Sequence, residues 1–282
     1  MGEVSLIVVP YELSRLRDGV GRGPEHLLGH GAVEALAEDG SAVETRLIEL
    51  DGGFSDEIEA CFELIRRVAV EVGDAVRRGS FPVVLSGSCF ASIGVVAGLA
   101  EEAPGVLWFD AHGDFNEPNS SIHGYFDGMG LAVLTGSAWQ GLLAEMEGSR
   151  VVPESAVVLA GARDLDPPEV VRLEASAIAH PSAAEIASPD ALLASLAGMS
   201  PTPTGLYVHV DLDVLDIDEA RVNVYSAPGG LTGDQLVGLV ESVMEAHPVR
   251  ALSLTAFDPE CDADGAVPPI ALNLLRAARR RR

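Results

Sequence analysis

Short apolar segments recur along the chain and alternate with longer segments in which apolar residues repeat at helical spacing. The expected strands are short β-branched or apolar runs at residues 5–9, 42–48, 82–85, 105–109, 156–160, 206–210 and 251–254. The expected helices lie between them, at residues 56–78, 90–102, 169–175, 183–197, 233–246 and 268–279. A strand that is apolar along its whole length is buried on both faces, which is typical of a parallel sheet covered by helices. We therefore predict an α/β fold with three layers, α/β/α, around a mostly parallel central sheet.

No repeat, linker or break in composition divides the 282 residues, so we expect a single domain over residues 1–282. A hydrophobic content of 48% excludes a disordered acidic protein. The net charge of −25 repels phosphate, which argues against nucleic acid or an anionic membrane as a partner. The apolar runs are too short to span a membrane, and the N-terminus lacks the pattern of a signal peptide. Three widely spaced cysteines are typical of free thiols, so we predict a cytoplasmic protein.

Two of the expected strands end in clusters of metal-ligand residue types. One runs into Asp110, His112 and Asp114, and another into Asp211 and Asp213. Alternate residues of an extended chain point the same way, and open α/β sheets bind ligands at the carboxyl ends of their strands. The alternative reading is a set of turn or capping aspartates. Two such clusters, one of them Asp-x-His-x-Asp, favour a metal site instead, and carboxylates with one imidazole suit one or two Mn²⁺ ions.

These clusters resemble the metal motifs of the ureohydrolases, the family of arginase, agmatinase and formiminoglutamase. The resemblance covers most of the chain. The segments that carry it are residues 21–24 (GRGP), 110–116 (DAHGDFN), 161–169 (GARDLDPPE), 211–216 (DLDVLD) and 229–232 (GGLT). The resemblance implies an arginase-like fold, a small-molecule substrate, a homo-oligomer and a site with two Mn²⁺ ions that hydrolyses a C–N bond through a metal-bridging hydroxide.

The resemblance also implies a role for each motif residue. Asp110 and Asp211 would bridge both ions, His112 and Asp213 would complete one metal position, and Asp114 would complete the other and hydrogen-bond the hydroxide. These aspartates and this histidine are therefore the expected metal ligands, and Asp114 is also an expected catalytic residue.

Further residues match the positions of proton transfer and substrate binding in the family. His123 would relay a proton to the leaving amine; the alternative is a plain surface histidine. Asp166 would receive a substrate amino group with support from Glu169, or would instead cap the helix that follows it. Asn116 would lie near the substrate carboxylate, and Asn119 stands at the position of an arginase serine, so both are expected to bind substrate.

The sequence departs from the family at one ligand position, where Cys89 replaces a histidine. A thiolate suits Zn²⁺ or Fe²⁺ better than Mn²⁺. Three outcomes stay open: a two-metal site with a bound thiolate, a site that binds its first metal ion more weakly, or a site with a single metal ion. A buried inert cysteine is the alternative to ligation, and a branch that hydrolyses hydroxyarginine resembles this chain in having cysteine here. His209 shares a strand face with Asp211, and we expect it to pack beneath the site rather than bind metal.

Two departures affect the substrate. Ala256 stands where arginases have a glutamate that contacts the guanidinium, and Asp258 or Glu260 are the candidates to replace it. Tyr225 brings bulk and a hydroxyl to a position that is small in the family. We therefore predict a hydrolase of a guanidino, hydroxyguanidino or formimino compound rather than an ordinary arginase or agmatinase. The alternative is a non-hydrolytic relative that binds a ligand or a partner protein.

Overall fold

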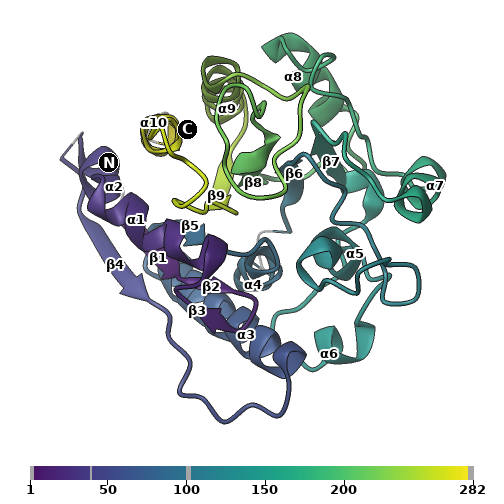
Figure 1. Ribbon diagram of the computed structural model, residues 1–282, viewed down its shortest axis with the longest axis horizontal. Helices are drawn as coiled ribbons and strands as arrows, with labels where there is room; N and C mark the ends of the chain where they lie inside the picture. Colours follow the sequence, from purple (N-terminus) through teal and green to yellow (C-terminus); the bar gives the residue numbers. More distant parts are fainter. Residues whose placement is uncertain (1–2, 39, 100–102, 279–282) are drawn as a thin grey trace.

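The central feature of the computed structural model, which describes residues 3–38, 40–99 and 103–278, is a parallel seven-stranded sheet (Figure 1). In spatial order its strands are β4 (Val43–Leu47), β1 (Val4–Val9), β5 (Phe81–Ser86), β9 (Val249–Thr255), β8 (Leu206–Asp211), β6 (Gly105–Phe109) and β7 (Val157–Ala160). All seven expected strands are present and differ from the expected bounds by at most two residues. The prediction of a mostly parallel sheet is confirmed.

Helices cover both faces of this sheet, which confirms the three-layer α/β/α architecture (Figure 1). One face packs against α1 (Gly23–Gly29), α2 (Ala32–Ala37), α8 (Pro189–Ala197), α9 (Gly233–Ala246) and α10 (Val267–Ala277). The other packs against α3 (Glu57–Arg77), α4 (Ala91–Gly98), α5 (Gly130–Leu134), α6 (Gln140–Ala144) and α7 (Pro167–Ala175). Strands β1, β5, β6 and β8, which lie between the two hydrophobic cores, are buried along their whole length, whereas most of the edge strand β4 is exposed.

Local sequence explains where the longest helices begin. Asp56 precedes α3 and its side chain accepts a hydrogen bond from the backbone N–H of Glu59 at 2.8 Å. Thr232 precedes α9 and forms a capping box with Gln235. Gly94 on α4 lets that helix approach α3 closely, because a Cβ at this position would lie 2.4 Å from the carbonyl oxygen of Ile65.

One expected helix begins later than the sequence indicated. The segment 183–197 is helical only from Pro189, since Ser188 is extended, as a residue before proline tends to be. Helix α4 ends at Gly98 and α10 at Ala277; residues 100–102 and 279, included in the expected helices, lie outside the described part of the chain. Four helices, α1, α2, α5 and α6, were not predicted from the sequence. The hairpin of β2 (Tyr11–Glu12) and β3 (Arg15–Leu16) was not predicted either.

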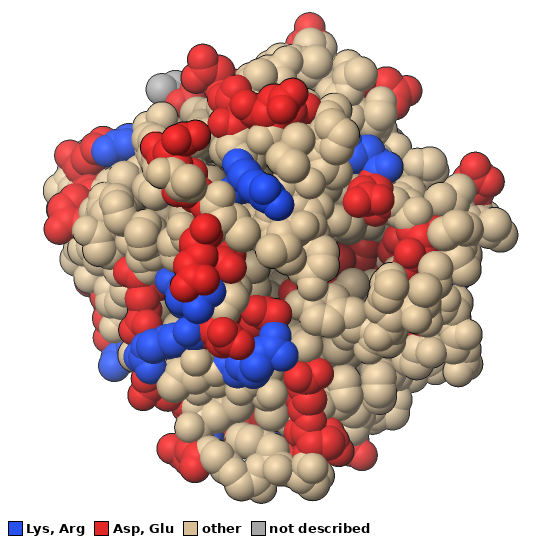
Figure 2. Space-filling view, in the orientation of Figure 1, with Lys and Arg blue, Asp and Glu red and all other residues tan. Residues whose placement is uncertain are grey.

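The surface carries its acidic groups in small clusters interleaved with arginine on the face shown in Figure 2. This arrangement agrees with a diffuse negative charge rather than one acidic patch on that face. Among the described residues, no helix combines the length and the apolar character needed to cross a membrane.

Candidate metal centre

The expected metal ligands come together at the carboxyl-terminal edge of the sheet. Cys89 follows β5, Asp110 follows β6 directly, and Asp211 is the last residue of β8. Because these strands are parallel, their carboxyl ends lie at one edge, and β9 lies between β5 and β8. The segments after three separate strands thus supply one site.

A histidine and two aspartates form the first part of the centre. The Nδ1 atom of His112 lies 3.3 Å from Oδ1 of Asp110 and 3.4 Å from Oδ2 of Asp213. One ligand atom from each of these residues lies within 4.8 Å of the others. Burial acts to lower the pKa of His112, but the two carboxylates outweigh it and raise that pKa above its ordinary value. Burial likewise opposes ionisation of Asp213, yet His112 holds the pKa of Asp213 at about 2.

Asp211 lies beside this group and accepts two hydrogen bonds. Its Oδ1 accepts from the backbone N–H of Asp213 at 2.8 Å, and its Oδ2 accepts from the thiol of Cys89 at 2.9 Å. Burial, followed by the charges of Asp213 and Asp110, raises the pKa of Asp211 well above its ordinary value. A bound cation would remove this like-charge repulsion.

Asp114 provides the observation that tests whether the donor set fits a metal. Its Oδ2 atom is buried and has no hydrogen-bond partner among the residues that the structure describes. Its backbone adopts φ +46°, a left-handed conformation that is uncommon outside glycine. Burial and then Asp110 raise the pKa of Asp114 well above its ordinary value. A buried acceptor without a donor, among carboxylates that repel it, fits a divalent cation as the missing partner.

Cys89 is present as a buried thiol at this same edge. Besides its bond to Asp211, its Sγ lies 3.1 Å from the hydroxyl of Thr255. Burial and then the charge of Asp211 raise the pKa of the Cys89 thiol well above its ordinary value. Without a cation the sulfur therefore keeps its proton.

A cavity of about 330 Å³ opens above the ligands. Seven of its lining residues are aspartate or glutamate, and none is arginine among the residues that the structure describes. Asn116, Asp166 and Glu169 line it, and Nδ2 of Asn116 donates to Oδ2 of Asp166 at 3.3 Å. Asp166 precedes α7 but makes no capping bond with its side chain, so its carboxylate faces the cavity rather than the helix. Glu169 is buried and accepts from the backbone N–H of Phe115 at 2.8 Å.

The remaining expected site residues lie at the rim. His123 lines the cavity from an exposed loop. Tyr225, 50% exposed, also lines it, with its ring 6.4 Å from that of His112. Tyr125 packs against Tyr225 at 6.1 Å. Asn119 is exposed in a neighbouring turn and does not belong to the cavity lining.

Asp258 and Glu260, the two candidates to replace the glutamate missing at position 256, do not face the cavity. Ala256 lines the cavity with a left-handed backbone (φ +65°). Asp258 and Glu260 instead pair with Arg22, at 3.4 Å and 3.0 Å, and neither belongs to the cavity lining. The described part of this wall therefore offers no carboxylate at the position of Ala256.

Sequence reasoning missed two buried polar residues of the cavity. Asp127 accepts from the backbone N–H of Phe90 at 2.9 Å, and burial raises the pKa of Asp127 to about 7. Asn223 donates through Nδ2 to Oδ2 of Asp213 at 3.1 Å and to the carbonyl oxygen of Ala256 at 2.9 Å. Asp127 precedes a glycine, and Asn223 lies in a loop, so both resemble ordinary turn residues. No local sequence pattern would have identified either of them as a cavity residue.

Comparisons with known proteins identify relatives of this chain in sequence and in fold. The arginase family profile matches residues 2–278. An arginase of Bacillus caldovelox is 29% identical over 98% of this chain and 97% of its own. The crystal structure of an arginase from Bacillus cereus superposes with a TM-score of 0.89 at 28% identity, covering 98% of both chains. A formimidoylglutamase from Bacillus subtilis shares the fold, with a TM-score of 0.73 at 20% identity over 99% of this chain and 87% of its own.

Proposed function

This chain belongs to the arginase family, and we propose that it is a metal-dependent hydrolase that cleaves a C–N bond of a small guanidino, hydroxyguanidino or formimino compound. The observation that carries the proposal is the buried Oδ2 of Asp114, which has no hydrogen-bond partner among the described residues and belongs to a cavity that His112, Asp211 and Asp213 also line. A set of oxygen donors with one imidazole suits Mn²⁺, and its size suits two ions.

Divalent cations held by these residues would lower the pKa of a shared water and supply hydroxide at neutral pH. In the reaction, water adds to the amidino or formimino carbon, the C–N bond breaks, and the leaving amine takes up a proton. Asp114 would hold the attacking oxygen by a hydrogen bond. His123 is our candidate for the proton donor, because its imidazole lines the cavity on a loop open to solvent.

The outer wall would bind the polar end of the substrate. Asp166 and Glu169 present carboxylates to a substrate amino group, and Asn116 offers an amide. Asn119 stays a prediction, because it lies outside the cavity lining. Tyr225 narrows the entrance and would select for compact substrates.

Ala256 favours a neutral or weakly basic reacting group over the strongly basic guanidinium of arginine. A buried cation without a partner is costly, and neither Asp258 nor Glu260 reaches this wall. A hydroxyguanidine or a formimino group tolerates the alanine better, since each is less basic than a guanidinium. The substrates we propose first are therefore hydroxyguanidines such as hydroxyarginine.

The direct test combines metal analysis with product assays. Purified protein dialysed against Mn²⁺ should retain one or two ions and release urea, a substituted urea or ammonia from at least one compound of a guanidino, hydroxyguanidino and formimino panel. Asp114→Asn should abolish turnover, whereas Asp234→Asn, an exposed change on α9, should not. Retention of no divalent ion, or no hydrolysis of any member of the panel, would contradict the proposal.

The second candidate is a ligand-binding protein without hydrolytic activity, and the thiol of Cys89 favours it by satisfying Asp211 without a metal. Cys89→His separates the two. If the native protein turns over substrate and the variant is equal or slower, Cys89 is an adapted residue of an enzyme. If turnover appears only in the variant, the native chain has lost catalysis.

We also propose that the chain forms a homo-oligomer and works in the cytoplasm. The oligomer rests on its family, and the location rests on its free thiols. Light scattering coupled to gel filtration would measure the assembly.

A further inference from the structure

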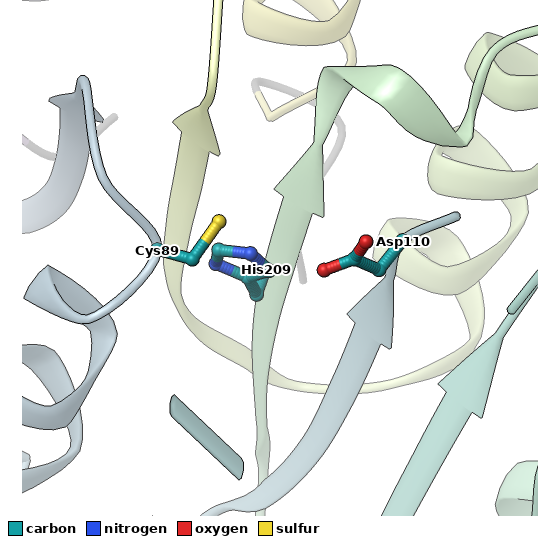
Figure 3. Close-up of side chains that lie close together, drawn as sticks. All are labelled: Cys89, Asp110 and His209. Atoms are coloured by element: carbon teal, nitrogen blue, oxygen red, sulfur yellow. The ribbon is translucent and has the colours of Figure 1, made fainter. Parts of the chain in front are cut away.

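An imidazole outside the predicted ligand set lies directly beneath the metal centre. His209 is fully buried on β8, two residues before Asp211 and on the same strand face. Figure 3 shows its ring between the side chains of Cys89 and Asp110. One ligand atom from each of these three residues lies within 4.8 Å of the others.

Two groups of donors therefore share one carboxylate. The first is Asp110, His112 and Asp213, and the second is Cys89, Asp110 and His209. A carboxylate has two oxygens and can serve both groups. The groups differ in chemistry, because the first offers oxygen and nitrogen and the second adds a sulfur.

The ring of His209 is held as metal-binding histidines are held. Trp108 stacks on it with centroids 3.7 Å apart, and its Nδ1 lies 2.8 Å from the hydroxyl of Ser92. The hydroxyl of Tyr207 lies 2.7 Å from the same Ser92 hydroxyl and completes a buried hydrogen-bond network around the ring. Metal-bound histidines anchor one ring nitrogen to such an outer partner and bind the metal with the other.

Within the described part of the chain, the second ring nitrogen of His209 has one hydrogen-bond partner, and that partner is distant. Nε2 of His209 lies 3.4 Å from the hydroxyl of Thr255, at the outer limit of a hydrogen bond. The stacked and anchored imidazole of His209 thus keeps this ring nitrogen available to a metal ion.

We infer that His209 Nε2, the Cys89 sulfur and an Asp110 oxygen form a position for a borderline-soft divalent ion such as Zn²⁺, next to the oxygen-rich position that suits Mn²⁺. This inference rests on the proposed metal-dependent function and adds a ligand and a metal preference to it. Mixed sulfur, nitrogen and oxygen donors suit Zn²⁺, Fe²⁺ or Co²⁺, whereas carboxylates with one imidazole suit Mn²⁺. The Cys89 thiol would release its proton to solvent on binding, and Thr255, 3.1 Å away, would donate to the sulfur.

Cobalt reports on this position without any activity assay, because a thiolate bound to Co²⁺ gives a near-ultraviolet charge-transfer band. We expect the native protein to show this band with one equivalent of Co²⁺, Cys89→Ser to lose it, and His209→Gln to bind this ion about 10-fold more weakly or worse. The matched controls are Cys261→Ser and His247→Gln, which change the same residue types away from the centre. They should bind cobalt as the native protein does.

X-ray absorption at the zinc edge provides a measurement on the native chain, in case His209→Gln fails to fold. One equivalent of Zn²⁺ should show one sulfur and an imidazole in the same coordination shell. A sulfur without imidazole, a shell without sulfur, or an unchanged cobalt band in folded His209→Gln would overturn the inference. Hydrolysis supported by Mn²⁺ with no cobalt band would overturn this inference alone, whereas the absence of any bound divalent ion would remove the proposed function as well.

Discussion

The amide of Asn223 donates a hydrogen bond to Oδ2 of Asp213 at 3.1 Å. The same Nδ2 also donates to the carbonyl oxygen of Ala256 at 2.9 Å, so one buried amide joins a candidate metal ligand to the wall of the cavity. The side chain oxygen of Asn223 in turn accepts from the backbone N–H of Tyr225 at 2.8 Å. Ligand orientation and cavity shape are therefore coupled through Asn223.

Asn223→Ala should weaken metal binding without destroying the fold. The change removes an outer hydrogen bond of a ligand, which typically costs about 10- to 100-fold in metal affinity. It also removes the hydrogen bond to the carbonyl oxygen of Ala256, at about 1–3 kcal/mol of unfolding free energy. Metal titration and thermal melting measure both effects, and exposed Asn273→Ala on α10 serves as the control. Equal metal affinity in the two variants would show that Asn223 does not orient Asp213.

Arg163→Met should destabilise the loop that carries Asp213. The guanidinium of Arg163 donates to the carbonyl oxygens of Asp213, Leu215 and Ala227, each at 3.0 Å. Losing a partly buried charged donor to several carbonyls costs on the order of 2–4 kcal/mol. Chemical denaturation would measure the loss, and Arg66→Met, which removes a surface pair with Glu63, should change stability by less than about 1 kcal/mol. Similar losses in both variants would contradict this role.

The sheet and the edge that carries the candidate metal ligands could be predicted because short stretches of sequence identify the strands and their ends. Apart from the edge strand β4, the strands of the sheet are mainly apolar runs of four to seven residues, and Asp110 and Asp211 stand where two such runs end. Short helices such as α1 and α2 could not be predicted in the same way. They hold only seven and six residues, and packing on the sheet rather than propensity stabilises helices of that length.

The less predictable part of the site depends on contacts between distant segments. From the sequence, Asp166 could equally be a helix cap or a residue of the substrate site. In the structure its side chain makes no capping bond and instead accepts a hydrogen bond from Asn116, 50 residues away. Asp127 can be recognised as part of the site only in the structure, where its carboxylate accepts a hydrogen bond from the backbone N–H of Phe90. The alternation of side chains along the strand was enough to predict that His209 shares a face with Asp211. The sequence could not predict that Cys89, which follows another strand, comes close enough to form a group of possible metal ligands with His209.

The stability of the metal-free protein should fall as pH rises from about 4 to about 8. Burial raises the pKa values of Asp110, Asp114, Asp127 and Asp211 in the folded state. The folded state then binds more protons than the unfolded state in this range, so the free energy of unfolding decreases with pH. For Asp127 the pKa of about 7, against an ordinary 3.8, corresponds to roughly 4 kcal/mol at most.

Added Mn²⁺ should reverse that trend, because metal ions bind the deprotonated carboxylates. Melting temperatures at pH 5 and pH 8, with and without metal, test the prediction. The increase on adding metal should be larger at pH 8. Asp114→Asn should reduce both the pH dependence of the metal-free protein and the effect of metal. A metal-free protein whose stability rises steadily with pH would show that these carboxyls are not protonated when folded.

Ala256→Glu should shift substrate preference toward strongly basic guanidinium compounds. Position 256 lines the cavity and already has a left-handed backbone, so an unbranched side chain adds little strain beyond that of alanine. A hydrogen bond between a carboxylate and a guanidinium contributes about 1.5–3 kcal/mol, which is about 10- to 100-fold in a ratio of kcat/KM values. The measurement is that ratio for arginine against hydroxyarginine, and Ala256→Gln separates charge from bulk. If the glutamate and glutamine variants shift the ratio equally, size at this wall rather than the missing carboxylate sets the preference.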